Sequence, residues 1–327
     1  MEILFIMNKY HYLLIVILLT VPTSPASIFP YSQSALKKIL LKNESVKELI
    51  EYKDNKNTLK LKLKVLGVIN KNRAKHGLKA VMLDILACRV ASKTSSEAVK
   101  GKYFGHWNLR GEKPYLRYAF SGGFHHVSEN ASMIKTAFPE KKTYKNILKF
   151  IITAHMEMYN EIPPNDGHRK NILNSWHTHV GIGFSLIGND FRYYELFLNK
   201  YLIFTPINTN RKAGEVIKIS GRVATPGYGV YYAIIYYEKI PLPLSPFEIA
   251  KKGSYPDFTD TRIASLPFWE INYNNNSKKF DFSFKTSRRG LYYIKIFIKK
   301  DHTGKEKLLR ASTKGLSPIS GIVIIAK

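Results

Sequence analysis

The stretch "NEIPPNDGHRKNIL", residues 160–173, contains the features that best predict the fold of this chain. Pro163 and Pro164 cannot continue a helix, and Asn165-Asp166-Gly167 has the composition of a tight turn. A helical pattern therefore ends before the prolines, the chain reverses direction, and His168 follows at once. We expect His168 to lie at a sharp corner rather than on a helix face, where its imidazole can point into a pocket.

The segments on either side of this corner change from helical to extended patterns. Apolar residues at helical spacing predict helices over 58–76, 83–100 and 144–161, and Gly77 is a plausible end for the first. After the corner, "HVGIGFSL", a Gly188-Asn189 turn and "FRYYELFLNKY" have the signature of a β-hairpin. Together these patterns predict an α+β domain over residues 58–205.

The remainder of the chain, residues 206–327, has a different pattern. The runs "EVIKISGRV", "VYYAIIYY", "KKFDFSFK" and "YYIKIFIK" are β-branched and aromatic, and clusters of Gly, Pro and Asn separate them. This pattern predicts a C-terminal all-β domain, a sandwich of the immunoglobulin-like kind. The insertion from Pro241 to Trp269 has several prolines and little periodicity, so we expect a loop or lid there.

The first 26 residues have the pattern of a secretory signal peptide. Lys9 precedes an apolar run over residues 12–21, and small residues surround the expected cleavage site at Ala26. The apolar run is shorter than the roughly 20 residues that a spanning helix needs, so we expect no stable membrane span after cleavage. Residues 27–57 are polar and Lys-rich and form a leader segment. These features predict a secreted, cell-surface or periplasmic protein.

Composition limits the class of protein and of partner. A chain of 327 residues with 45% hydrophobic content can bury the cores of two ordinary domains and is not disordered. The formal net charge of +27 is compatible with an anionic surface as partner, but it is spread along the chain and defines no binding site. A compositional bias towards Lys is the alternative explanation, and a nucleic-acid partner is not expected. The single cysteine, Cys88, excludes an intramolecular disulfide, and its helical surroundings indicate a small core residue rather than a nucleophile.

Several short motifs occur in a characteristic order. His106 begins the pattern H-x4-G-x2-P-x2-R, Glu129 lies in "SENAS", and His168 lies in "GHRKNIL", which "GIG" follows. With "NKNRAKHGL" and "LDILACRVAS" upstream, this order resembles the CAP superfamily, which includes cysteine-rich secretory proteins, plant pathogenesis-related proteins and bacterial secreted relatives. The resemblance covers roughly residues 60–200 and leaves the β-rich part outside it.

The resemblance implies a CAP-type α-β-α sandwich, with a central antiparallel sheet between helical layers and an open cleft. In the family, two histidines and two acidic residues line that cleft. Carried over to this chain, His106 and His168 match the histidines and Glu129 matches the first acid. Glu161 in "MYNEI" is the preferred match for the second acid, and Glu157, one helical turn earlier, is the alternative.

Two imidazoles and two carboxylates around one space are compatible with three kinds of site. His106 and His168 could bind a divalent metal ion, for which the ligand type favours Zn²⁺. The four groups could instead act as general acids and bases, or hold loops in place as a structural polar network. No Ser-His-Asp or H-E-x-x-H pattern supports a hydrolase, since His155-Met156-Glu157 has no second histidine at the required spacing.

The other polar residues near these motifs are expected to have supporting roles. Four histidines are placed outside the site: His125, His126, His177 and His179. Arg117 and Asn130 are interpreted as scaffold, with Arg117 paired to an acid. We therefore expect a secreted, non-catalytic binding module for a lipid, a peptide or a cell-envelope component. The alternative hypothesis is a metal-dependent secreted hydrolase that uses the same four residues.

Overall fold

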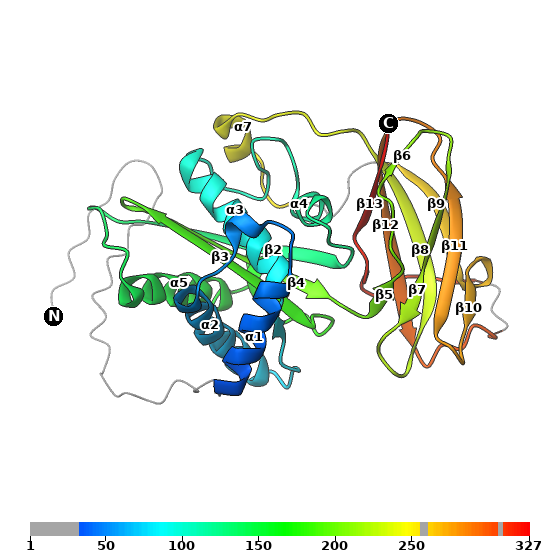
Figure 1. Cartoon of the computed structure of the whole chain (residues 1–327), viewed down its shortest axis with the longest axis horizontal. Helices are drawn as coiled ribbons and strands as arrows, with labels where there is room; N and C mark the ends of the chain where they lie inside the picture. The colour runs from blue at the N-terminus through cyan, green and yellow to red at the C-terminus, as the bar shows by residue number, and fades with distance from the viewer. Residues whose placement is uncertain (1–32, 256–260, 307–309) are drawn as a thin grey trace. The chain divides into compact units, whose positions relative to one another are not determined.

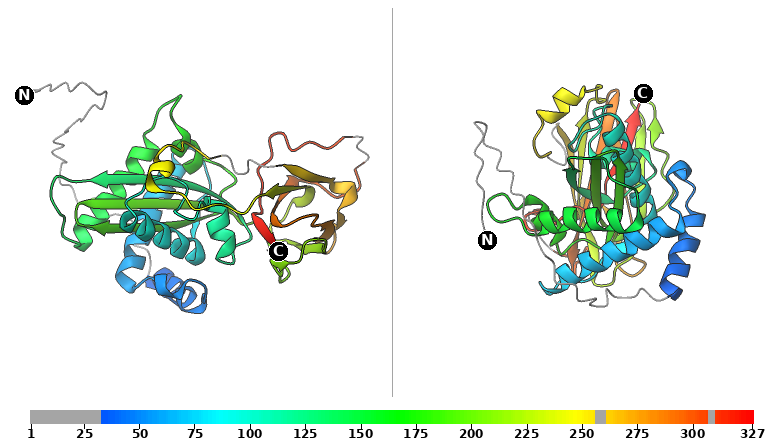
Figure 2. Two further views of the ribbon diagram at one scale, coloured as in Figure 1. Left: turned by 90° about the horizontal axis from the view of Figure 1, so that it is seen from above. Right: turned by 90° about the vertical axis from the view of Figure 1, so that its left-hand side faces the viewer.

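Two layers of helices enclose a four-stranded sheet in the computed structural model, which describes residues 33–255, 261–306 and 310–327 (Figure 1). The predicted signal peptide over 1–26 lies outside the described residues. The strands are β1 (Met82–Leu83), β2 (His126–Lys135), β3 (His179–Ile187) and β4 (Asp190–Asn199), in the order β1-β3-β4-β2. Helices α2 (Lys56–Ala74) and α5 (Tyr144–Tyr159) cover one face, and α3 (Ile85–Lys100) and α4 (Pro114–Phe120) cover the other (Figures 1 and 2).

The central strand β4 is buried on both faces, and its sequence explains why. Successive side chains of a strand point to opposite faces, so Tyr193 and Phe197 join the core under α2 and α5. Tyr194, Leu196 and Leu198 join the core under α3 and α4. A strand covered on both sides is apolar along its whole length, as "FRYYELFLN" nearly is.

The helices expected over 58–76, 83–100 and 144–161 are confirmed as α2, α3 and α5, and the expected hairpin is confirmed as β3–β4. A side chain caps each of these helices: Asn55 accepts the Thr58 N–H, Asp84 accepts the Ala87 N–H, and Thr143 accepts the Asn146 N–H. Helix α4 and strand β2 were not predicted. Helix α4 has only 7 residues, and the β2 sequence "HVSENASMIK" has no regular apolar period. The leader contains α1 (Gln33–Ser45) and the 3-10 helix η1 (Ile50–Tyr52).

The "GIG" motif allows α3 to lie directly against β3. A Cβ at Gly183 would lie 2.0 Å from the backbone carbon of Ala91, and one at Gly181 would lie 2.3 Å from that of Ala87. Ala87 and Ala91 are one helical turn apart on the same face of α3. Small residues on both elements therefore set the distance between the helix and the sheet.

The β-rich part contains two further sheets, with strand orders β10-β11-β7-β5 and β6-β13-β12-β8-β9. Their strands are β5 (Leu202–Phe204), β6 (Asn210–Arg211), β7 (Val216–Val223), β8 (Tyr228–Glu238), β9 (Arg262–Pro267), β10 (Asn272–Asn274), β11 (Lys279–Lys285), β12 (Gly290–Lys300) and β13 (Ile322–Ala326). Buried side chains from both sheets share one core, for example Ile219 of β7 and Ile294 of β12. The immunoglobulin-like arrangement and independent folding of 206–327 remain predictions.

The insertion between Pro241 and Trp269 was expected to be a loop or lid, but part of it has regular structure. It contains the short helix α7 (Pro246–Ala250), strand β9 and the 3-10 helix η2 (Phe268–Glu270). A capping box between Ser245 and Glu248 starts α7, and β9 is held by its pairing with β8. Pairing with a distant strand is not visible in a local pattern.

Candidate functional site

His106 is oriented by a buried ion pair. It lies in the loop between α3 and α4, and its Nδ1 is 3.0 Å from Oε1 of Glu129 on β2. The other oxygen of Glu129 accepts a hydrogen bond from the guanidinium of Arg117 on α4. The Glu129 side chain has no solvent exposure and that of Arg117 is 4% exposed. Burial is the largest single effect and lowers the pKa of Arg117, but the charge and hydrogen bond of Glu129, together with Tyr103 and Tyr194, raise this pKa above its ordinary value.

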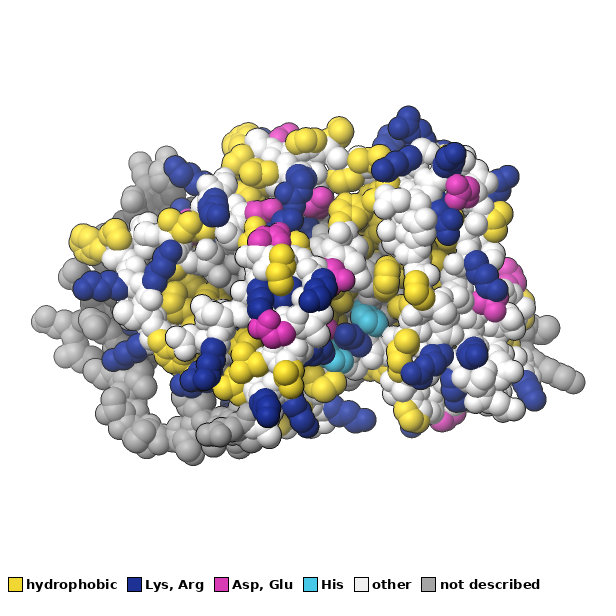
Figure 3. Space-filling model, in the orientation of Figure 1, with side chains coloured by type: hydrophobic (Ala, Val, Ile, Leu, Met, Phe, Trp, Pro, Cys, Tyr) yellow, Lys and Arg dark blue, Asp and Glu magenta, His cyan; other side chains and the backbone are white. Residues whose placement is uncertain are grey.

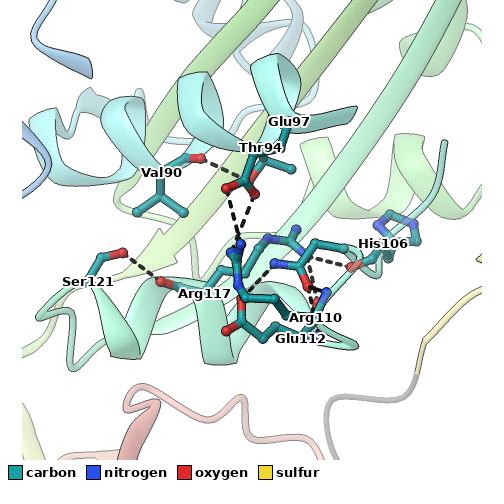
Figure 4. A network of polar contacts seen from close by, with 9 residues as sticks. Val90, Thr94, Glu97, His106, Arg110, Glu112, Arg117 and Ser121 are labelled. Carbon is teal, nitrogen blue, oxygen red and sulfur yellow. Dashed lines mark hydrogen bonds and ion pairs between the residues drawn. The ribbon is translucent and has the colours of Figure 1, made fainter. Parts of the chain in front are cut away.

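The same arginine fixes the backbone of the loop that carries His106. Arg117 donates from Nη1 to the His106 carbonyl oxygen at 2.6 Å, as Figure 4 shows. Arg110 bridges Glu97 of α3 and Glu112 of the loop (Figure 4). The position of His106 therefore depends on α3, α4 and β2 together.

His168 belongs to a second pair, with Glu161. Its Nδ1 contacts Oε1 of Glu161, while Oε2 accepts the backbone N–H of His168 at 2.9 Å and that of Arg169 at 3.4 Å. The prediction that His168 lies off a helix was wrong, because it is in the first turn of α6 (Gly167–Ile172). The Glu161 carboxylate pairs with N–H groups that the start of a helix leaves unsatisfied. Glu157 is exposed on α5, so Glu161 is the acid beside His168.

Asn130 links the two pairs. It follows Glu129 on β2, and its Nδ2 donates to the His168 carbonyl oxygen at 3.2 Å. Asn171 in turn donates to Asn130 Oδ1 at 2.8 Å. Among the described residues, no three His, Cys, Asp or Glu side chains are grouped so that they could hold a metal ion. The four predicted site residues thus form two histidine–carboxylate pairs, and Zn²⁺ binding by His106 and His168 stays a prediction.

A third histidine–carboxylate pair, which was not predicted, consists of His155 and Glu195 and is in contact with Asn130. His155 Nδ1 is 2.7 Å from Oε1 of Glu195, and both side chains have no solvent exposure. Tyr193 donates to the same oxygen at 2.8 Å, and Asn130 donates to the other at 3.3 Å. An acidic residue, Glu195, in the middle of the mainly apolar strand "FRYYELFLN" was the available signal, because buried acids need partners.

The histidines that were placed outside the site are mainly structural. His177 bonds Asn199 through Nδ1 and Asn171 through Nε2, and burial lowers its pKa to about 3. Burial also lowers the pKa of His125 to about 3 and that of His179 to about 4. Cys88 is fully buried, and burial raises the pKa of its thiol to about 12. The thiol is therefore protonated at neutral pH and is not a nucleophile.

In the His106–Glu129 and His168–Glu161 pairs, each histidine is partly exposed and can present one ring nitrogen. A carboxylate only accepts hydrogen bonds, so Nδ1 of His106 and of His168 carries the proton and Nε2 carries a lone pair when the ring is neutral. The His106 side chain is 15% exposed and that of His168 is 34% exposed. Each Nε2 can accept a hydrogen bond, take up a proton or bind a metal ion.

On the face drawn in Figure 3, Lys and Arg are spread over the surface. Within the described part of the chain, no helix is long and apolar enough to cross a membrane.

Comparisons with known proteins agree with the geometry. Residues 66–201 match the model of the CAP family, described as the cysteine-rich secretory protein family. The uncharacterized protein YkwD of Bacillus subtilis (strain 168) is 27% identical over 122 residues, which cover 37% of this chain and 41% of that protein. The chain therefore spans less than half of this relative's length.

Two solved structures are similar to part of the chain. One is an extracellular protein with an SCP domain from Bacillus anthracis, 22% identical, which covers 53% of this chain and 45% of its own at a TM-score of 0.32. The other is an outer surface protein from Borrelia burgdorferi, 17% identical, which covers 43% of this chain and 92% of its own at a TM-score of 0.33.

Proposed function

Because this chain is a CAP-domain protein, a member of the cysteine-rich secretory protein family over residues 66–201, we propose that it is a secreted or cell-surface binding module. In this proposal, Nε2 of His106 and Nε2 of His168 accept hydrogen bonds from a lipid, a peptide or a cell-envelope component. Glu129 and Glu161 orient the two rings. An anionic surface remains a further partner that the net charge of +27 favours.

One observation carries the proposal: both oxygens of each carboxylate have a partner within the protein. Glu129 uses one oxygen for His106 and the other for Arg117. Glu161 uses one oxygen for the His168 ring and the other for two backbone N–H groups. An acid held in this way orients its histidine, but it is not free to bind a metal ion or to activate water without breaking those bonds.

Native mass spectrometry of the exported full-length protein tests the proposal. We expect a bound small molecule or lipid on the wild type and its loss from the double variant His106→Gln, His168→Gln. His76→Gln is the matched control, because His76 is exposed beyond the end of α2 and contacts neither pair. Retention of the same molecule by the double variant would contradict a role for these rings.

The same proteins test the alternative of a metal-dependent hydrolase. Hydrolysis of a chromogenic ester that requires added Zn²⁺, is stopped by a chelator and is lost in the double variant would replace the binding proposal. We expect no such turnover, since the described residues group no third ligand with either histidine.

A further inference from the structure

We propose that residues 241–255 form a gate over the His106–Glu129 pair and that Tyr255 is the latch of this gate. The segment leaves β8 of the β-rich part and runs along residues 104–112, the loop that carries His106 (Figure 1). The β-rich part thereby supplies a residue to the candidate site of the CAP domain. The inference rests on the proposed function only in naming His106 as the group that the gate covers.

One end of the gate is firmly anchored. Ile249 of α7 is completely buried, and a Cβ on Gly105 would lie 3.3 Å from its Cγ2. The Leu244 N–H donates to the Leu109 carbonyl oxygen at 2.9 Å. A Cβ on Gly111 would lie only 2.2 Å from the Leu242 carbonyl oxygen, so the two backbones are in close contact. The gate thus follows the His106 loop along much of its length.

The other end reaches the pair itself. The Tyr255 hydroxyl accepts the backbone N–H of Glu129 at 3.0 Å. Strand β2 is at the edge of its sheet, so one side of its backbone has no neighbouring strand in that sheet and needs another partner. The Tyr255 ring centroid lies 4.8 Å from that of His106 and 6.3 Å from that of Trp107. The His106 side chain, which this ring contacts, is 15% exposed, against 34% for that of His168.

Release of α7 and release of Tyr255 would expose side chains that differ in how deeply they are buried. Release of Ile249 would bring a fully buried side chain into water, whereas Tyr255 is only partly buried. The outer side of the segment contains Leu242 and Phe247, which are 78% and 68% exposed and therefore add little to its attachment. We therefore expect opening to begin at Tyr255, with α7 as the fixed end.

Chemical modification of the histidines in the full chain tests the gate without any ligand. Diethyl pyrocarbonate modifies accessible imidazole nitrogens, and peptide mass spectrometry gives the rate at His106 and at His168 separately. Tyr255→Phe removes only the hydroxyl, so we expect the rate at His106 to rise about five-fold, the factor to which one ordinary hydrogen bond corresponds. Tyr255→Ala also removes the ring, and we expect a rise of about ten-fold or more.

Two controls make the outcome decisive. The rate at His168 should not change in either variant, because the segment does not contact that pair in any described interaction. Tyr237→Phe is the matched variant, since it removes a hydroxyl bonded to a backbone carbonyl, that of Arg289, away from the gate. Unchanged rates at His106 in both Tyr255 variants, or equal rises at both histidines, would overturn the proposal. Because no ligand is used, failure of the binding proposal would not affect this result.

Discussion

Arg117 should be the most sensitive position of the candidate site, because it neutralises a carboxylate that has no contact with water. Replacement by Met keeps much of the side-chain volume but leaves Glu129 charged and buried, with its side chain at 0% exposure. Removal of one partner of a buried ion pair typically costs about 3–5 kcal/mol of unfolding free energy. Arg117→Met also loses the 2.6 Å hydrogen bond to the His106 carbonyl, so we expect the upper part of that range.

Urea denaturation at pH 7 with tryptophan fluorescence measures this effect, since Trp107 is next to His106. The double variant Arg117→Met, Glu129→Gln removes the uncompensated charge and should recover at least about 2 kcal/mol of the loss. A cost below about 1 kcal/mol for Arg117→Met would refute the reasoning, as it would place the pair among solvent-screened surface ion pairs. A double variant no more stable than the single one would refute it equally.

Three further outcomes are expected. Burial lowers the folded-state pKa of both His125 and His177 to about 3, so between about pH 6.5 and pH 3 only the unfolded chain takes up their protons. The unfolding free energy should therefore fall as the pH drops through this range, by up to about 2.7 kcal/mol per pH unit for the two groups. Equal urea midpoints at pH 7 and pH 5 would contradict this. Gly183→Ala should cost about 1–3 kcal/mol or more because its Cβ would meet the α3 backbone, while Ser185→Ala on the same strand should change stability little in the same denaturation assay. N-terminal sequencing of exported protein should begin after Ala26, and a sequence that starts at Met1 would argue for a membrane anchor.

Much of the helical layer was predictable from short-range patterns. The helices α2, α3 and α5 have apolar residues at helical spacing and a side-chain cap directly before the first turn. The β3–β4 hairpin was predictable because Gly188-Asn189 is a turn sequence between two extended runs. In the structure, Gly188 adopts the positive φ of 61° that the turn requires. The order of the motifs around His106, Glu129 and His168 indicated the family, because each motif is a local run of residues.

The sequence by itself therefore determined the main helices, the hairpin and the residues of the His106–Glu129 and His168–Glu161 pairs. Only the tertiary structure decided the partners: Glu195 meets His155 from 40 positions away, and Tyr255 meets Glu129 from 126 positions away. A helix or turn is selected by neighbours along the chain, so its signal is written in a few consecutive residues. A buried hydrogen bond is selected by which surfaces the folded chain brings together, and neither partner's local sequence identifies the other.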